Sequence, residues 1–316
     1  MAILIKENIP SLVDMSIQDF IKLGINGVYT TMKTVLSHEY IFNLTLHMKN
    51  LCKYTTEFLN LQRTKDNEEY ISKILKCVTV ENIRKHCCEN IKKAFEFLNN
   101  LNDDLKRKYF NENSDYMIIV TVMWETENNN ISLNRNYSIL CFIKSLPCHP
   151  NNIQIDIMYG QRKLPNIKYT DVFEIKDKLL KMKCPDSHEI VLYNDKHEIT
   201  EGLTCNFFCF FNDTLYTSKD ELVLNGTIRK EIIDLCEKEG VKLKKDSINI
   251  KDIEYFEFCF ICSTTRNILP IKKIILFSDN KKTFEKNVNH PILIHLQKKL
   301  QEIIEKKKEK YDVYIS

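Results

Sequence analysis

Two side chains that can do covalent chemistry together are Lys168 and Glu201. A lysine amine attacks an aldehyde only after it loses its proton, and burial in a desolvated pocket encourages that loss. Leu164, Ile167 and Val172 lie near Lys168 in the sequence and would supply apolar surroundings. A carboxylate such as that of Glu201 can keep a bound ring nitrogen protonated. Because the chain has 46 lysines and arginines, Lys168 is singled out only by its spacing to the glutamate segment and by the proline that precedes it.

An anion-binding turn follows this pair along the chain. The residues Gly226-Thr227-Ile228-Arg229 open a predicted helix, and the backbone N–H groups at a helix N-terminus bind phosphate. Thr227 and Ile228 are therefore candidate phosphate ligands. Arg229, in the first turn of that helix, fits either a structural ion pair or a place in the site.

The region from residue 162 to residue 274 resembles the class IV aminotransferases. This fold type IV group of pyridoxal phosphate enzymes includes branched-chain aminotransferase, D-amino acid aminotransferase and aminodeoxychorismate lyase. The resemblance is carried by Lys168, by Glu201-Gly202-Leu203-Thr204-Cys205-Asn206-Phe207-Phe208, by the turn at Gly226 and by Cys262-Ser263-Thr264-Thr265-Arg266. The lysine precedes the glutamate segment at the family's usual spacing.

The resemblance assigns a role to each matched residue. Lys168 is expected to form a Schiff base with pyridoxal 5'-phosphate, and Glu201 to face the pyridine nitrogen. Gly202 is expected to let the backbone pass close to the ring. The remaining expected cofactor-binding residues are Asn206, Thr227, Ile228 and Thr264.

The segment Gly24–Lys33 resembles the early strand of the family, which lines the substrate side. Tyr29 and Thr30 are therefore expected to bind substrate together with Arg266, and Thr31 to take part in catalysis. The pair of threonines is closer to aminodeoxychorismate lyase than to the aminotransferases, in which a glutamate commonly holds the first position.

Several positions depart from the family's pattern. The segment His47-Met48-Lys49-Asn50-Leu51 places Asn50 where the family has an arginine that anchors the cofactor phosphate, so a bidentate cation is missing. Lys49 would point to a different face of a helix. Lys33 stands where the early strand usually has arginine, and Ser263 replaces a glycine.

These residues predict an enzyme and leave three functions open. The first is a lyase that converts 4-amino-4-deoxychorismate to 4-aminobenzoate and pyruvate for folate synthesis, through a Schiff base on Lys168. The second is a branched-chain or D-amino acid aminotransferase. The third is a degenerate member of the fold that acts as a binding protein, for which Asn50 and the irregular loop 263–267 are the evidence. Retention of Lys168 and Glu201 argues against the third.

Other polar residues have structural explanations. Arg162 is expected to be a solvated arginine, with a contact to a substrate carboxylate as the alternative. Among the eight histidines, His47, His188 and His197 lack a second ligand at metal spacing and are expected to be surface or packing residues. Cys259 and Cys262 fall in an apolar strand, so we expect no metal site there.

Composition excludes several classes of protein. The 316 residues are 43% hydrophobic and 28% charged, which is a globular balance, and the formal net charge of +3 gives no reason to expect a nucleic acid partner. The 12 cysteines are scattered and fit reduced core residues. No apolar run reaches the length of a membrane span, and the first residues do not resemble a secretory signal. We expect a cytoplasmic homodimer that acts on a small molecule.

The hydrophobic pattern predicts an α+β fold with two domains. Helical spacing occurs over 40–61, 68–109, 172–182, 226–239 and 288–311, and strand patterns occur over 115–124, 136–143, 152–158, 189–194, 206–211 and 255–262. Residues 1–159 are expected to form a helix and antiparallel sheet domain, and residues 160–316 a cofactor-binding domain. By resemblance to D-amino acid aminotransferase, the cofactor is expected in the cleft between them.

Overall fold

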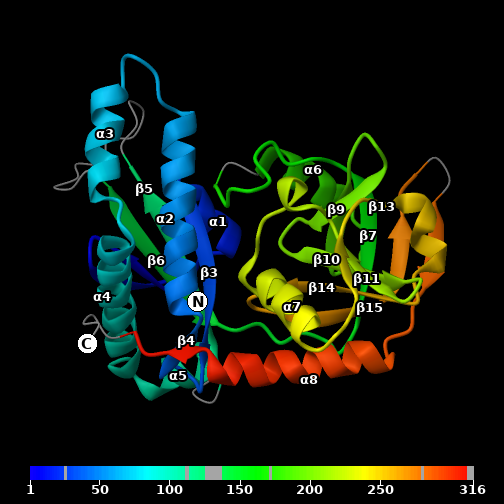
Figure 1. The fold of residues 1–316 in the computed structure, drawn as a ribbon. Coiled ribbons are helices and arrows are strands. Elements are labelled where there is room, and N and C mark those ends of the chain that lie inside the picture. The colour runs from blue at the N-terminus through cyan, green and yellow to red at the C-terminus, as the bar shows by residue number, and fades with distance from the viewer. Residues whose placement is uncertain (25–26, 111–113, 125–136, 171–172, 279–280, 312–316) are drawn as a thin grey trace. The chain divides into compact units, whose positions relative to one another are not determined.

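The computed structural model describes residues 1–24, 27–110, 114–124, 137–170, 173–278 and 281–311, and it divides into two compact units (Figure 1). Unit 1 contains residues 1–147, 167–171 and 304–316. Unit 2 contains residues 148–166 and 172–303. The chain therefore crosses from one unit to the other more than once, and the short segment that carries Lys168 belongs to unit 1.

Unit 1 is built on a seven-stranded sheet in the order β17-β4-β3-β5-β6-β1-β2. Its pairings are antiparallel. The central strand β5 is buried along its whole length, because its apolar side chains are covered on both faces. The strands are β1 (Ala2–Lys6), β2 (Ile9–Val13), β3 (Val28–Val35), β4 (Tyr40–Phe42), β5 (Tyr116–Met123), β6 (Ser138–Ser145) and β17 (Lys308–Glu309).

Two long helices pack against this sheet. Helix α2 (Leu44–Leu61) contacts β3, and α4 (Val80–Asn99) contacts β1 and β6, while the two helices also contact each other (Figure 1). Both are amphipathic and place their apolar residues on the buried side. The shorter helices of unit 1 are α1 (Ile17–Leu23), α3 (Glu68–Cys77) and α5 (Asp103–Tyr109).

The N-terminus of α2 is capped from the far end of the chain. The carboxylate of Glu309, rather than a side chain next to the helix, accepts hydrogen bonds from the Thr45 backbone N–H at 3.0 and 3.2 Å. Arg84 of α4 lies 3.6 Å from the same carboxylate. A helix N-terminus has unpaired N–H groups and a partial positive charge. The carboxylate therefore accepts a hydrogen bond from one of these groups, and its negative charge also stabilises the helix.

Unit 2 is built on a ten-stranded sheet in the order β12-β11-β10-β14-β15-β7-β8-β9-β13, with β16 paired to β15. A further pairing of Asn206 in β10 with Glu201 in β9 closes the sheet on itself. The strands are β7 (Ile153–Tyr159), β8 (Glu189–Tyr193), β9 (Glu198–Gly202), β10 (Asn206–Phe211), β11 (Thr214–Thr217), β12 (Leu243–Lys245), β13 (Ile248–Asn249), β14 (Phe258–Ser263), β15 (Asn267–Leu276) and β16 (Lys282–Glu285).

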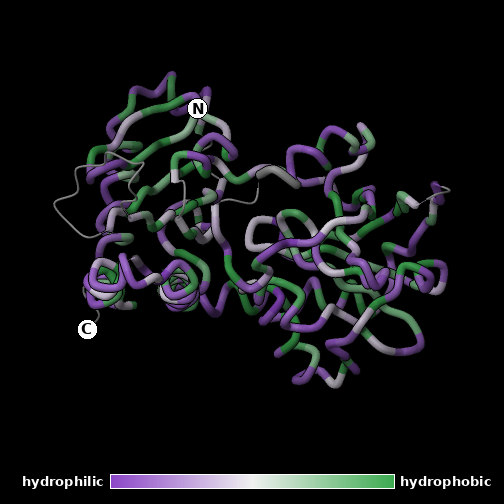
Figure 2. Tube along the Cα trace, turned by 90° about the horizontal axis from the view of Figure 1, so that it is seen from above, coloured by the Kyte–Doolittle hydropathy of each residue, from purple (hydrophilic) through white to green (hydrophobic). Residues whose placement is uncertain are grey.

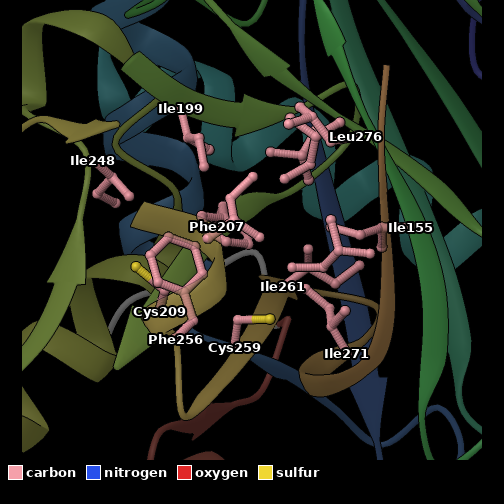
Figure 3. Packing of buried hydrophobic residues seen from close by; sticks show 14 of the residues in the cluster. Ile155, Ile199, Phe207, Cys209, Ile248, Phe256, Cys259, Ile261, Ile271 and Leu276 are labelled. Carbon is pink, nitrogen blue, oxygen red and sulfur yellow. The ribbon is translucent and has the colours of Figure 1, made fainter. Parts of the chain in front are cut away.

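The closed sheet encloses a tightly packed apolar core. Alternate residues of neighbouring strands point into it, as expected for a strand repeat of two residues. Figure 3 shows Ile155 of β7, Phe207 of β10 and Ile261 of β14 gathered there, with the buried thiols Cys209 and Cys259 beside them. The interior of this sheet is therefore filled by side chains, and a ligand must bind at its edges or its loops.

The described α-helices of unit 2 are α6 (Phe173–Met182), α7 (Thr227–Lys238) and α8 (Pro291–Lys306), the last three residues of which are assigned to unit 1. Hydrophobic and hydrophilic residues alternate over short distances along the tube in Figure 2, as amphipathic elements require. Within the described ranges, no helix has the length and apolar character needed to cross a membrane. All 12 cysteines are free thiols, and eight lie buried, including Cys259 and Cys262.

The structure confirms the α+β mixture that the sequence predicts. The expected helix over 40–61 begins four residues later, because β4 occupies the start of that range, and the expected helix over 68–109 is three helices. The first residues of two expected elements, 136 and 172, lie outside the described residues. Strand β7 pairs with β8 and β15, so residues 148–159, expected in the first domain, lie in unit 2.

Replacing Glu309 by alanine should destabilise unit 1. The change removes the cap of α2 and leaves Arg84 without this carboxylate, so we expect the free energy of unfolding to fall by about 1–2 kcal/mol. Urea unfolding followed by fluorescence of Trp124, which packs 5.8 Å from the ring of Phe58 in α2, measures this loss. Lys310→Ala, at an exposed neighbouring position, is the control. Equal midpoints for the two variants would contradict the capping role.

Candidate active site

The backbone around Lys168 is held against strand β3. The Tyr29 N–H donates to the Lys168 carbonyl at 2.9 Å, and Val28 pairs with Tyr169 as an isolated antiparallel bridge. The Thr170 N–H donates to the Gly27 carbonyl at 3.0 Å. These contacts fix the segment as an extra extended stretch beside β3, although it lies far from β3 in the sequence.

The amine of Lys168 meets two of the residues predicted with it. Its Nζ donates to Thr31 Oγ1 at 3.3 Å and lies 5.0 Å from the centre of the Tyr29 ring. Tyr29 and Thr31 are two residues apart on β3, so both side chains point to the face on which Lys168 lies. The structure therefore brings Lys168, Tyr29 and Thr31 together.

Thr30 points to the opposite face of β3 and contacts helix α2. Its Oγ1 lies 2.8 Å from His47 Nδ1, and both side chains are buried. Burial, together with the charge of Lys168, lowers the pKa of His47 to about 3, so this imidazole is neutral. The expected role of His47 as a packing residue agrees with its burial, and the substrate-binding role of Thr30 stays a prediction.

The positions that depart from the family's pattern lie on or near the same elements. Asn50 is half-buried on α2, and Lys49 is exposed. Lys33 of β3 is only 5% exposed. Burial lowers the pKa of Lys33 to about 8, while the charges of Asp115 and Glu305 oppose that fall.

Glu201 lies at the end of β9 and is 3% exposed. Its Oε1 accepts a hydrogen bond from Arg162 Nη1 at 2.7 Å. Its Oε2 accepts from the Leu224 N–H at 3.0 Å and from Asn206 Nδ2 at 3.3 Å. Burial raises the pKa of Glu201, while Arg162 and the Leu224 N–H oppose the rise because they favour the ionised form. Sequence analysis missed this role of Arg162, which it expected to be solvated.

Two glycines make room for side chains of this cluster. A Cβ atom on Gly226 would lie 2.5 Å from Asn206 Oδ1, and one on Gly202 would lie 2.3 Å from Cys205 Sγ. Gly202 was expected to admit a cofactor ring, and in the structure its missing side chain admits the Cys205 thiol. Asn206 also donates to the Leu224 carbonyl at 2.8 Å, which ties the loop before α7 to the closure of the sheet.

The N-terminus of α7 has the form of an anion site. Gly226 is the N-cap residue and makes no side-chain cap, and the buried residues Thr227 and Ile228 follow it. The first N–H groups of a helix lack partners within the helix. Thr264, which is 9% exposed, lies in the turn between β14 and β15 of the same unit.

Arg229 and Arg266 are both engaged within unit 2. Arg229 donates from Nη1 to Asp220 and Asn225, both at 2.8 Å, so it makes the structural ion pair that the sequence left as one alternative. Arg266 donates to Thr204 Oγ1 at 2.8 Å, and its Nη1 lies 3.2 Å from Glu189 Oε2. A contact of Arg266 with substrate stays a prediction.

Glu201 and the N-terminus of α7 have the hydrogen-bonding groups that pyridoxal 5'-phosphate needs. A carboxylate accepts about four hydrogen bonds, and Glu201 receives three, which leaves capacity for a protonated ring nitrogen. The N-terminus of α7 supplies N–H groups for a phosphate. Among the residues that the structure describes, no group of three or more His, Cys, Asp or Glu side chains could hold a metal ion.

Comparison with known proteins supports the same assignment. A sequence model described as Amino-transferase class IV matches residues 27–274. A protein of Rickettsia typhi named probable branched-chain-amino-acid aminotransferase is 36% identical over 87 residues, which are 28% of this chain and 30% of that protein. A D-alanine aminotransferase of Bacillus licheniformis is 27% identical over 99 residues, 30% of this chain and 35% of that protein. The matched segments thus span about a third of these relatives.

Solved structures resemble the chain over nearly its whole length. The branched-chain aminotransferase of Thermoproteus uzoniensis with norvaline has a TM-score of 0.67 at 15% identity and covers 99% of both chains. A Legionella pneumophila protein assigned as 4-amino-4-deoxychorismate lyase has a TM-score of 0.61 at 16% identity and covers 92% of this chain and 96% of its own. These likenesses confirm the fold type IV expectation.

Replacing Arg162 should show how much the buried charge of Glu201 destabilises the protein when its cation is missing. In Arg162→Met we expect unit 2 to lose about 3 kcal/mol of stability at pH 8, because a buried carboxylate loses its cation. The pKa of Glu201 then lies further above its unfolded value, so stability falls as the pH rises and the loss is smaller at pH 5. Urea unfolding followed by circular dichroism at both pH values measures the effect.

The double variant Arg162→Met/Glu201→Gln is the matched control for this loss. It removes the buried charge, so at pH 8 it should be more stable than the single variant. Equal stability of the two variants at pH 8 would show that the charge of Glu201 does not depend on Arg162.

The buried amine of Lys33 should make the stability of unit 1 depend on pH. Between pH 8 and pH 10 the unfolded chain binds more protons at Lys33 than the folded chain does, so stability rises with pH. We expect the wild-type protein to gain about 2 kcal/mol relative to Lys33→Met over this range. Urea unfolding followed by Trp124 fluorescence measures both profiles, and parallel profiles would contradict a lowered pKa.

Proposed function

The chain belongs to the class IV aminotransferases, and on that premise we propose that it is a pyridoxal phosphate-dependent aminotransferase for branched-chain or D-amino acids. The observation that supports the proposal most directly is the position of Lys168. Its backbone is paired with β3, and its amine reaches Thr31 beside the Tyr29 ring. A fixed, half-buried amine next to a hydroxyl is suited to bind an aldehyde and then to move a proton.

Each residue of the site has a proposed task. Lys168 Nζ would hold the cofactor and would carry a proton to or from the bound amino acid. Thr31 would orient this amine. Glu201 would face the ring nitrogen of the cofactor, and Arg162 and Asn206 keep its carboxylate in place. When bound, pyridoxal phosphate supplies an electron sink for the bond that breaks.

The aminotransferase replaces the lyase as the preferred function. The sequence favoured the lyase because of Thr30 and Thr31, whereas the curated relatives are named aminotransferases. The lyase stays the second candidate, since the Legionella pneumophila protein assigned as 4-amino-4-deoxychorismate lyase shares the fold. A role in folate synthesis is proposed only together with the lyase activity. Members of one fold catalyse different reactions, so the reaction must be measured.

The homodimer and the cytoplasmic location expected from the sequence belong to the same proposal. Twelve free thiols suit a reducing compartment. Light scattering on the purified protein measures the mass of the assembly, and a mass of one chain would exclude the homodimer.

Borohydride reduction of the protein with pyridoxal phosphate should label Lys168. Reduction makes the bond between amine and cofactor permanent, and peptide mapping then identifies the lysine. Lys168→Ala should lose the label and the accompanying visible absorption, while Lys163→Ala, an exposed neighbour, should keep both. A label spread over surface lysines would contradict the proposal and favour a binding protein without chemistry.

Substrate class is tested with the same preparation. We expect transfer of the amino group from a branched-chain L-amino acid or from D-alanine to 2-oxoglutarate, measured as the oxo acid formed, and at least 10³-fold slower transfer in Lys168→Ala, roughly the scale of general acid–base catalysis. Formation of 4-aminobenzoate from 4-amino-4-deoxychorismate without any transfer would instead establish the lyase.

A further inference from the structure

Unit 2 contains a cavity that is large enough for a small organic molecule. It lies between the segment before β7, the start of β15 and the first turns of α8, and its volume is about 440 Å³. All the residues that line it belong to unit 2. Ligand cavities in proteins usually measure roughly 300–1,000 Å³, so this one is in the range of a binding site.

The polar side chains of this cavity favour an anion. Of the described residues that line it, none is acidic, and one is a permanent cation. The polar members are Arg266, His149 and the carboxamides of Asn151, Asn152, Asn289 and Gln297. Carboxamides can donate through their NH2 groups, and a guanidinium can only donate. A ligand with negatively charged oxygens therefore suits this lining better than a cation does.

The guanidinium of Arg266 is held in place at one of its nitrogens. Its Nη1 donates to Thr204 Oγ1 at 2.8 Å and lies 3.2 Å from the carboxylate of Glu189. Both contacts involve the same nitrogen, and the side chain is 19% exposed. A guanidinium carries five N–H donors in a fixed plane, so the donors on Nε and Nη2 can pair with a ligand. Glu189 and Thr204 thus orient a cation that keeps capacity for a second anion.

The electrostatic environment of the wall agrees with this assignment. Burial lowers the pKa of His149, and the positive charge of Arg266 adds to the fall, as does His188. Because its neighbours disfavour a proton on this imidazole, they favour a negative charge at the same place. The His149 ring is itself neutral at pH 7, so Arg266 supplies the positive charge of the lining.

The rest of the lining is apolar and suits a hydrocarbon body. Ile268 and Pro270 are buried residues of β15, and Ile294 lies on α8. Gln297 Nε2 donates to the Ile268 carbonyl at 3.3 Å, which joins α8 to β15 beside the cavity. Apolar surface gains free energy when it leaves water, so a ligand with a short hydrocarbon chain binds here better than a bare inorganic ion.

We propose that this cavity of unit 2 binds a small organic carboxylate. The carboxylate oxygens accept hydrogen bonds from the Arg266 guanidinium, whose planar donors match a carboxylate, and the hydrocarbon body packs against Ile268 and Pro270. The inference goes beyond the proposed function, because none of these contacts requires pyridoxal phosphate or Lys168.

The test follows the ring signal of His149 by NMR in the full chain labelled with ¹³C-histidine. His149 lines the cavity, and its signal is the one that disappears in His149→Gln. We expect 3-methylbutanoate to shift this signal until the site is saturated. The uncharged 3-methylbutanamide has the same shape and should bind at least roughly 10-fold more weakly, the scale of a hydrogen bond to a charged group. Equal affinity for the two compounds, or no shift with either, would overturn the inference.

Arg266→Gln removes the cation of the cavity. We expect the dissociation constant of 3-methylbutanoate, read from the His149 signal, to rise roughly 10- to 100-fold, while binding of the amide changes little. The variant also leaves the buried carboxylate of Glu189 without this arginine, so circular dichroism is used to verify that it is folded. An unchanged dissociation constant in the folded variant would contradict the proposed role of Arg266.

Ile294 allows the same test without a change to any buried contact. It lines the cavity and is 51% exposed, so the fold tolerates a polar side chain there. Relative to Ile294→Gln, we expect Ile294→Glu to weaken 3-methylbutanoate roughly two- to fivefold and Ile294→Lys to tighten it by a similar factor. Gln301→Glu is the matched control, because it adds the same charge at an exposed position of α8 that does not line the cavity. Equal weakening by Ile294→Glu and Gln301→Glu would overturn the inference, since binding would then follow only the total charge of the protein.

A final sample identifies the source of the carboxylate. In it, borohydride has fixed pyridoxal phosphate on Lys168. If 3-methylbutanoate still shifts the His149 signal, the natural carboxylate is a ligand other than the reactants. If the shift is lost, the carboxylate is a reactant of the enzyme. Both results agree with a carboxylate site at Arg266, whereas a shift caused by inorganic phosphate and not by 3-methylbutanoate would refute it.

Discussion

The arrangement of unit 2 depends on the carboxylate of Glu201, which is almost completely buried. Ionised Glu201 cannot remain in an apolar interior without a cation and hydrogen-bond donors, because removing a charge from water costs several kcal/mol. Arg162, Asn206 and the Leu224 N–H supply them. These partners lie after β7, on β10 and before α7, so one charge joins three separate parts of the unit. The sheet closes at the same two residues, Glu201 and Asn206.

The same hydrogen bonds position the start of α7. Asn206 donates to both Glu201 and the Leu224 carbonyl, and its Oδ1 lies where any side chain on Gly226 would collide. The start of α7 is therefore fixed relative to the carboxylate by hydrogen bonds from the buried Asn206 and Glu201 side chains to the backbone of Leu224. Arg229 completes this support from within the helix, since it ties the turn through Asp220 and Asn225. A rigid turn can present its N–H groups without reorganisation when an anion binds.

The Lys168 amine of unit 1 is positioned by a different set of contacts. An extended segment from the middle of the chain pairs with β3, and the alternation of side chains along that strand separates two functions. Tyr29 and Thr31 face the lysine, whereas Thr30 faces α2 and its histidine. Helix α2 is in turn capped by Glu309 near the end of the chain. The geometry around Lys168 thus depends on residues that are distant from it in sequence.

Sequence alone was sufficient for the features that depend on local pattern. The hydrophobic period identified most helices and strands, and the motif around Lys168, Glu201 and Gly226 indicated the family, because residue types at set spacings reflect local geometry and chemistry. Tertiary structure alone decided the partners. Arg162 was expected in solvent and pairs with Glu201, Gly202 makes room for a thiol, and Glu309 caps a helix more than two hundred residues away. Such contacts join segments whose separation along the chain carries no periodic signal, so they form only when burial of the core brings them together.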